Sequence, residues 1–304
     1  MAAGVKSRPE KFSGKAYVIK THFGKMTIDI HEFPDGRPFE TIASVGAVGS
    51  DLMADAAAIG MAVSFALRLE DSLIEPSVRL GYFVSKFRPM NGGGAYEAGG
   101  EKITSLPSAI AFGIKKYLSG HPLEAADTPL PPRPDAADVR MFVVPTHFGN
   151  LTLDVHIKDG EPFEIIVNVG AAGSDLMADA MAIGIGLSIC LRLPASMPAK
   201  ERIQWFIDRF VKIGGNGSYG NGNGKVTSLP SAVARGLQRF MVKFYGDPLP
   251  APESYHEVSS IKQGDVPPGK VMSSEPCPEC GAHGSMYMAE GCATCQNCGY
   301  SKCS

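Results

Sequence analysis

The chain contains two copies of one sequence unit, and this repetition constrains its fold more than any other feature. Thr21-His22-Phe23-Gly24 returns as Thr146-His147-Phe148-Gly149, and residues 46–69 match residues 170–193 at 17 of 24 positions. The segment Thr104-Ser-Leu-Pro-Ser-Ala109 returns unchanged at 227–232. Copies of this size can bury a core of their own, so the sequence predicts two similar domains.

Each copy predicts strands followed by helices. Residues 26–30 and 151–155 alternate apolar and polar side chains, and each run leads through an Asp-Gly turn into a second apolar run, which is typical of a hairpin. Helical spacing of apolar residues follows over 52–67 and 176–191, and further helices are predicted over 73–87, 106–118, 199–213 and 229–244. This order favours an α+β fold over a wound parallel sheet.

Two glycines lie inside the long predicted helices, at Gly60 and Gly184. Glycine in a helix interior costs about 1 kcal/mol relative to alanine. We therefore expect another element to pack closely against each helix at these positions.

Composition divides the chain further. Pro-rich and polar stretches are typical of extended linkers. We predict six segments: an N-terminal tail (1–14), a first repeat (15–122), a Pro-rich linker (123–138), a second repeat (139–248), a polar linker (249–274) and a cysteine-rich module (275–304).

Charge and hydropathy exclude several classes of protein. The net formal charge of −2, from 29 basic and 31 acidic residues, argues against generic binding to a phosphate backbone. The longest apolar stretch, at 54–69, is shorter than a bilayer span, and the N-terminus lacks the apolar core of an export signal. We expect a cytoplasmic protein without a membrane-spanning segment.

Six of the seven cysteines lie between positions 277 and 303, in two Cys-x-x-Cys pairs and their surroundings. Two such knuckles supply the tetrahedral sulfur shell that Zn²⁺ prefers, so we expect a structural zinc ribbon. Glycines after Cys280 and Cys298 favour a ligand set of Cys277, Cys280, Cys295 and Cys298. A rival set consists of Cys277, Cys280, Cys292 and Cys295. Disulfides are less favoured, because the rest of the chain has only Cys190, which is predicted to be a core residue.

A glycine-rich loop and a lysine precede the repeated Thr-Ser-Leu-Pro-Ser motif in both copies. Loop amides, a cation and a helix N-terminus can converge there on a phosphate or a carboxylate. The candidate anion-binding residues are Lys102, Thr104, Ser105, Lys225, Thr227 and Ser228. The alternative is structural, with Ser105 and Ser228 as helix N-caps.

Other polar residues give weaker signals. Asp51 with Asp55, and Asp175 with Asp179, lie at i, i+4 spacing and can hold a divalent ion, although helix capping explains the first-turn acids equally well. No catalytic triad or acid–base pair emerges, and the histidines are assigned structural roles.

The repeated unit, with its Asp-Gly-x-Pro-Phe-Glu turn, its Gly-x-x-Gly-Ser run into an alanine-rich helix and its Thr-Ser-Leu-Pro-Ser motif, resembles the TSCPD domain in the C-terminal region of adenosylcobalamin-dependent (class II) ribonucleotide reductases. The tail from Cys277 to Cys303 is similar to the C-terminal ribbon of those enzymes. The Cys and the Asp of the family's Thr-Ser-Cys-Pro-Asp motif are replaced in both copies here, by Leu106 and Ser108 in the first and by Leu229 and Ser231 in the second.

The resemblance implies an accessory or split-off component that acts on a catalytic ribonucleotide reductase chain in trans. Nothing in the sequence corresponds to the catalytic barrel or to a cobalamin pocket, so cobalamin is expected only through the partner. The chain is not expected to be catalytic alone; as part of an enzyme it would belong to a ribonucleoside-diphosphate reductase.

The resemblance also implies a redox role for the tail. The two cysteines that the preferred zinc set leaves over, Cys292 and Cys303, can exchange with a partner's disulfide, and the rival set leaves Cys298 and Cys303. A thioredoxin-like reductant and a nucleotide or phosphate ligand are expected as further partners. An alternative function from another class is that of a non-catalytic zinc-ribbon module that binds nucleic acid or nucleotide. A third hypothesis is a pseudo-dimer around a small-molecule cleft.

The zinc assignment gives a direct prediction. The purified chain should contain one zinc ion, and Cys295→Ser should release it because three thiolates cannot complete the tetrahedral shell. Metal analysis under reductant measures this. A Cys295→Ser protein that keeps its full zinc content excludes both ligand sets.

Overall fold

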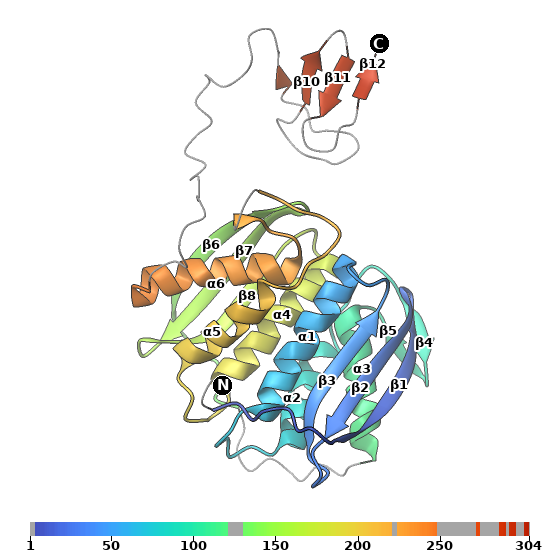
Figure 1. Cartoon of the computed structure of the whole chain (residues 1–304), viewed down its shortest axis with the longest axis vertical. Helices are drawn as coiled ribbons and strands as arrows, with labels where there is room; N and C mark the ends of the chain where they lie inside the picture. Colours follow the sequence, from blue (N-terminus) through green and yellow to red (C-terminus); the bar gives the residue numbers. More distant parts are fainter. Residues whose placement is uncertain are drawn as a thin grey trace. The chain divides into compact units, whose positions relative to one another are not determined.

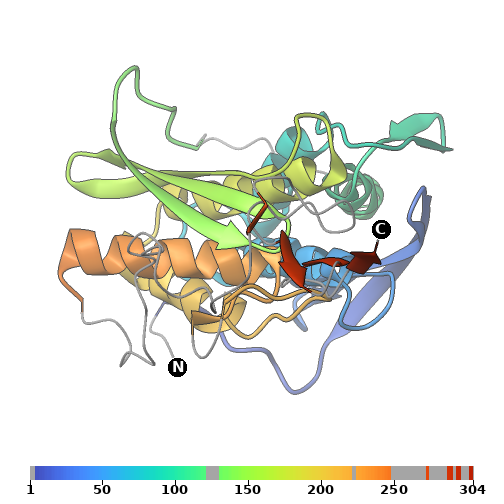
Figure 2. The same cartoon turned by 90° about the horizontal axis from the view of Figure 1, so that it is seen from above.

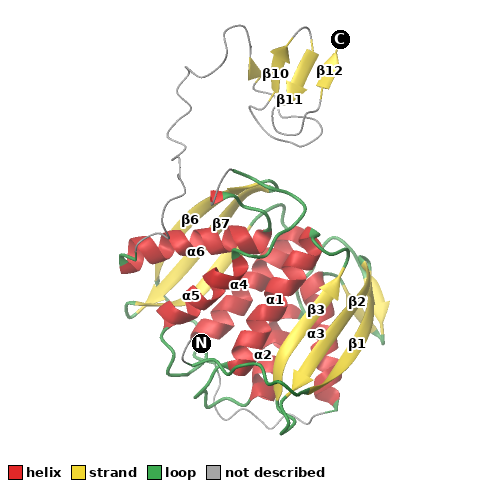
Figure 3. Ribbon diagram, viewed as in Figure 1, coloured by secondary structure: helices red, strands yellow, loops and turns green. Residues whose placement is uncertain are grey.

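The computed structural model describes residues 4–120, 130–220 and 224–247, together with short strands in the C-terminal region. Residues 1–254 form one compact unit and residues 255–304 a second. Both sequence repeats therefore lie in the same unit (Figure 1). The predicted α+β class is confirmed, since the structure contains both helices and sheets (Figure 3). Strands precede helices at the start of each repeat.

The two repeats share an order of three strands followed by three helices, and the first has two additional short strands, β4 and β5, before its third helix. The first contains β1 (Ser13–Thr21), β2 (Gly24–Glu32), β3 (Pro38–Val45), α1 (Asp51–Arg68), α2 (Pro76–Phe87), β4 (Tyr96–Ala98), β5 (Glu101–Ile103) and α3 (Leu106–Ser119). The second contains β6 (Asp138–Thr146), β7 (Gly149–Lys158), β8 (Glu161–Asn168), α4 (Asp175–Arg192), α5 (Ala199–Phe210) and α6 (Leu229–Tyr245). The first strand of each sheet and the β4–β5 ribbon were not predicted from the sequence.

The second unit has a small antiparallel sheet with strand order β12-β11-β10-β9. Its strands are β9 (Met272–Ser273), β10 (Met286–Ala289), β11 (Cys292–Cys295) and β12 (Ser301–Cys303). The backbone register pairs Cys292 with Cys303 across β11 and β12.

Each sheet of the repeats is a three-stranded antiparallel meander. The strand orders are β1-β2-β3 and β6-β7-β8. Thr21 pairs with Gly24 at the first hairpin, so His22 and Phe23 form a two-residue turn. Gly24 has a φ of 111°, a conformation that glycine adopts without steric cost. The turn therefore holds His22 at the tip of the hairpin.

The long helices lie against the outer edges of the third strands, at the two interior glycines. A Cβ on Gly60 would lie 3.0 Å from the carbonyl oxygen of Thr41, and one on Gly184 would lie 2.9 Å from that of Ile165. The Ser188 hydroxyl accepts a hydrogen bond from the Ile165 amide at 2.9 Å and lies 3.1 Å from the Ile165 carbonyl oxygen. Ser64 lies in the same way against Thr41. The expected close packing at both glycines is confirmed.

The two repeats meet through α1 and α4, which lie side by side between the two sheets (Figures 1 and 2). The equivalent residues Ala62 and Gly186 face each other, because a Cβ on Gly186 would lie 2.8 Å from that of Ala62. The thiol of Cys190 donates a hydrogen bond to the Ala62 carbonyl oxygen at 3.3 Å. One continuous cluster of buried apolar side chains extends across both repeats.

No helix among the described residues combines the length and the apolar character that crossing a bilayer requires.

Gly184→Ala should destabilise the protein by roughly 1–3 kcal/mol, because the added methyl group pushes α4 away from the β8 edge. The matched control is Gly81→Ala in α2, where an added Cβ meets open space. This control should stabilise the helix by about 0.5–1 kcal/mol. Urea unfolding measures both changes. Equal effects of the two substitutions would contradict the close approach of α4 to β8.

Candidate functional site

The polar groups singled out in the sequence meet where the two repeats touch. Each repeat presents a hairpin histidine and a glycine-rich loop to the first turn of the other repeat's long helix. We call these two places the inter-repeat sites: the first consists of His22, residues 92–94 and Asp175, and the second of His147, residues 215–217 and Asp51. They are related by the sequence repeat.

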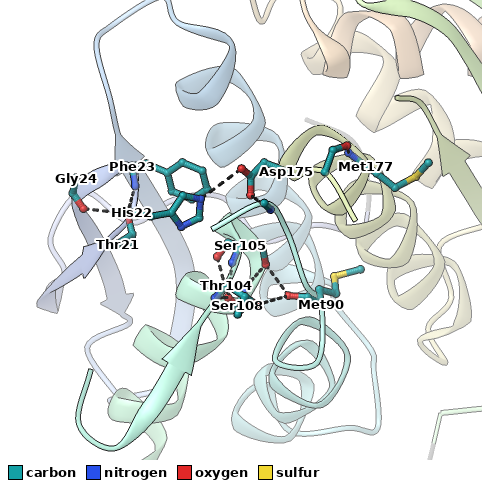
Figure 4. Close-up of polar contacts among 12 residues, drawn as sticks. Thr21, His22, Phe23, Gly24, Met90, Thr104, Ser105, Ser108, Asp175 and Met177 are labelled. Carbon is teal, nitrogen blue, oxygen red and sulfur yellow. Dashed lines mark hydrogen bonds and ion pairs between the residues drawn. The ribbon is translucent and has the colours of Figure 1, made fainter. Parts of the chain in front are cut away.

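The first inter-repeat site is formed by the β1–β2 turn and the start of α4 (Figure 4). His22 Nε2 lies 3.3 Å from Asp175 Oδ2, and the imidazole lies against the Phe23 ring with centroids 3.7 Å apart. Asp175 is the first residue of α4, where a carboxylate complements the positive end of the helix dipole. The Asp175 carboxylate thus interacts with both the helix dipole and His22.

The glycine-rich loop contacts the same carboxylate. The Gly93 amide donates a hydrogen bond to Asp175 Oδ1 at 3.1 Å, and the Gly92 amide donates one to the Thr104 carbonyl at 3.1 Å. A Cβ on Gly92 would overlap the Asp175 carboxylate, and one on Gly94 would overlap the His22 ring. Glycine is therefore required where this loop meets the other repeat.

The second inter-repeat site repeats this arrangement with slightly longer distances. The Asn216 amide donates to Asp51 Oδ1 at 3.2 Å, and His147 Nε2 lies 3.6 Å from Asp51 Oδ2. That separation suits an ion pair but is too long for a hydrogen bond. The two repeats therefore contact each other through two equivalent sets of interactions.

The predicted anion-binding residues lie beside these loops. The Ser105 hydroxyl accepts from the Ser108 amide at 3.2 Å and donates to the Met90 carbonyl at 2.8 Å, so it is the N-cap of α3. Ser228 caps α6 in the same way. The Thr104 hydroxyl donates to the Met90 carbonyl, and Thr227 accepts from the Gly215 amide through its backbone.

The two candidate lysines precede the same helices. Lys102 lies on β5, and Lys225 lies in the segment before α6. The structure thus brings each glycine-rich loop to a helix N-terminus, and the carboxylate on the loop comes from the other repeat. Binding of an external anion by these six residues stays a prediction.

Two further carboxyl groups lie between the inter-repeat sites, on Asp55 and Asp179. Each side chain is 3 % exposed, and its Oδ1 has no hydrogen-bond partner within the described part of the chain. Burial raises the pKa of Asp55 well above its ordinary value, and the Asp51 carboxylate raises it further. The pKa of Asp179 is raised by burial, then by Asp55 and Asp175. We call Asp55 and Asp179 the inner carboxyl pair.

The inner carboxyl pair can hold protons, and the inter-repeat sites join the two repeats. Charges of like sign in a buried setting favour the protonated form of the inner carboxyl pair. The divalent-ion alternative for these aspartates is not supported in the described ranges, where no group of three or more His, Cys, Asp or Glu side chains is arranged to bind a metal.

The cysteine predictions fall largely elsewhere. Cys277, Cys280 and Cys298 lie outside the described residues, and Cys292, Cys295 and Cys303 are described only by their backbone in β11 and β12. Cys190, by contrast, is fully buried, and burial raises the pKa of its thiol. It is the core residue that the sequence predicted.

Sequence reasoning missed that each site is completed by the other repeat. The sequence did contain a signal for this arrangement, because the same glycine-rich loop, histidine and aspartate occur in both copies. Glycines that no turn requires indicate close contact with another element. Nothing in one copy alone, however, tells whether the contact lies within or between copies.

A comparison with protein families gives one match that extends over most of the chain. The model described as the TSCPD domain matches residues 4–118 and 125–241. No curated protein and no solved structure matches. The residues that depart from the Thr-Ser-Cys-Pro-Asp motif have structural roles, since Leu106 is buried and Ser108 completes a capping box with Ser105.

The inner carboxyl pair predicts a pH dependence of stability. In the folded protein the pKa values of both groups are raised, so the folded state binds more protons than the unfolded state above the ordinary Asp value of 3.8. This contribution is fully present below that value and is lost as the pH rises through the raised folded-state values.

Asp179→Asn should remove much of this loss and stabilise the protein at pH 7 by on the order of 1 kcal/mol or more. The control is Asp208→Asn on the exposed side of α5. Urea unfolding between pH 4 and pH 8 compares the variants. An Asp179→Asn protein with the wild-type pH profile would contradict the burial of this pair.

Proposed function

The chain belongs to the TSCPD domain family, and from that membership we propose that it is an accessory component of a B12-dependent ribonucleotide reductase. In this role it binds the catalytic chain in trans and supports deoxyribonucleotide synthesis without a catalytic centre of its own. The family match over both repeats is the observation that carries the proposal, because TSCPD domains are associated with ribonucleotide reductase-related proteins.

The architecture of the first unit supports a binding role. The reciprocal inter-repeat contacts use the histidines, the loop amides and the first-turn aspartates to join the two repeats. Each of these contacts in one repeat has its equivalent in the other, as expected of contacts that hold the two repeats together. What the unit offers a partner is a compact, duplicated surface.

The tail supports a part in electron transfer. Cys292 and Cys303 face each other in the register of β11 and β12. Paired residues in antiparallel strands have α-carbons roughly 4.5–5.5 Å apart, which lies in the range of disulfides at about 4.4–6.8 Å. The same two cysteines remain when zinc takes Cys277, Cys280, Cys295 and Cys298, and the rival pair of Cys298 and Cys303 includes a residue outside the described ones.

The proposed exchange balances as follows. A thiolate of the tail attacks a disulfide of the catalytic chain and forms a mixed disulfide, and the second tail cysteine then displaces the partner's sulfur. The partner gains two electrons and two protons, and the tail becomes a disulfide. A thioredoxin-like reductant restores the tail dithiol. The zinc ion has a structural role in this scheme.

The test mixes the full chain with the catalytic chain of a B12-dependent ribonucleotide reductase from the same organism. We expect a complex in size-exclusion chromatography and thioredoxin-coupled turnover that falls at least ~10-fold with Cys303→Ser, since a single thiol cannot resolve the mixed disulfide. Dithiothreitol should restore turnover by reducing the catalytic chain directly.

The matched control is Ser301→Ala, a change in the same strand that leaves both cysteines in place. It should behave as the wild type. Failure to form a complex contradicts the accessory role, whereas a complex in which Cys303→Ser keeps full turnover contradicts only the redox part.

A further inference from the structure

A pocket of about 690 Å³ lies in the first unit between helix α2 of the first repeat and elements of the second repeat. This volume is within the range of about 300–1,000 Å³ that is usual for small-molecule sites. The second repeat contributes β8 and α4, and the segment before β6 contributes Leu130 and Arg133. We call it the α2–β8 pocket.

The sequence repeat makes an equivalent groove in the other half, and there large aromatic side chains fill it. Tyr82 and Ile189 of the α2–β8 pocket correspond to Trp205 and Phe65. The rings of Trp205 and Phe65 contact each other with centroids 4.8 Å apart, and both residues are buried. Because Tyr82 and Ile189 are smaller than Trp205 and Phe65, they leave open in the α2–β8 pocket the volume that the two rings fill in the other half.

The inner wall of the α2–β8 pocket is apolar. Ile185 and Ile189 of α4 line it, together with the Tyr82 ring from α2. Met181 is 42 % exposed, which is high for a large apolar side chain in the middle of a helix. Exposed apolar surface inside a concave site is typical of a ligand-binding pocket.

The rim carries an excess of positive charge. Lys86, Arg133 and Arg192 line the pocket, against the single carboxylate of Glu164. Arg133 pairs with Glu164 at 2.8 Å, and Arg192 Nε donates to the Pro131 carbonyl at 2.9 Å. A guanidinium has five donors, so each arginine keeps further N–H groups for a ligand.

The geometry points to a binding site for a small organic anion in the α2–β8 pocket. A flat apolar body of the ligand packs between Tyr82, Met181 and Ile189, and its anionic group lies on Arg133 and Arg192. None of its lining residues belongs to the inter-repeat sites or to the tail, so the proposal does not depend on the proposed function.

The test uses 2-naphthoate as the probe and 2-naphthylmethanol as its uncharged counterpart, with the full chain labelled at isoleucine methyl groups. Saturable NMR shifts should occur at the pocket isoleucines, which are Ile165, Ile166, Ile185 and Ile189. The alcohol should bind about 10-fold more weakly, a difference of about 1.4 kcal/mol. Shifts that are absent, or that are equal for both probes, overturn the proposal.

Two sets of variants locate the site. Tyr82→Trp with Ile189→Phe copies the filled half and should abolish binding of both probes. Arg133→Gln should weaken 2-naphthoate about 10-fold and leave the alcohol unchanged. This second variant keeps the test valid if the double substitution unfolds the protein.

The matched control comes from the repeat itself. Arg8 is equivalent to Arg133 and pairs with Glu40 at 3.1 Å, as Arg133 does with Glu164. Arg8→Gln should leave the affinity for both probes unchanged. Equal weakening by Arg8→Gln and Arg133→Gln would show that the probe responds to overall charge and would overturn the assignment.

Discussion

The close approach of α1 and α4 determines the rest of the first unit. Ala62 and Gly186 let the two helix backbones come together, and a larger side chain at either position would separate them. With the helices in contact, Asp55 and Asp179 are buried near each other, and Asp51 and Asp175 lie within reach of the opposite repeat's loop and histidine. One packing contact thus positions both inter-repeat sites and the inner carboxyl pair.

Much of the fold could be predicted from the sequence, because its signals are local. The helices at 52–67 and 176–191 are strongly periodic, and the capping roles of Ser105 and Ser228 follow from their place before Pro-containing first turns. The site could not be completed, since His22 meets Asp175 across 153 positions of sequence. Segments expected to be a tail and a linker also pack: Arg8 and Arg133 make equivalent ion pairs with Glu40 and Glu164. Such contacts depend on tertiary packing, which no local pattern records.

Duplication within one chain lets the two halves diverge while the interface stays symmetric. The aspartates, the histidines and the two outer loop glycines (Gly92 and Gly94, Gly215 and Gly217) are the same in both repeats, as the reciprocal contacts require. The grooves beside α2 and α5 differ, with Tyr82 and Ile189 in one and Trp205 and Phe65 in the other. In a homodimer the two grooves could not differ in this way, because each substitution would occur in both subunits. The α2–β8 pocket uses this freedom.

The two repeats fold as one body through α1 and α4, so they should also unfold together. Trp205 is the single tryptophan, it lies in the second repeat, and its ring contacts Phe65 of the first. The most direct measurement is therefore urea unfolding of Ala62→Val, followed in parallel by Trp205 fluorescence and by far-UV circular dichroism. We expect coincident transitions by both probes, shifted together to lower urea. Two separate transitions, or a Trp205 transition unmoved by a substitution in the first repeat, would contradict it.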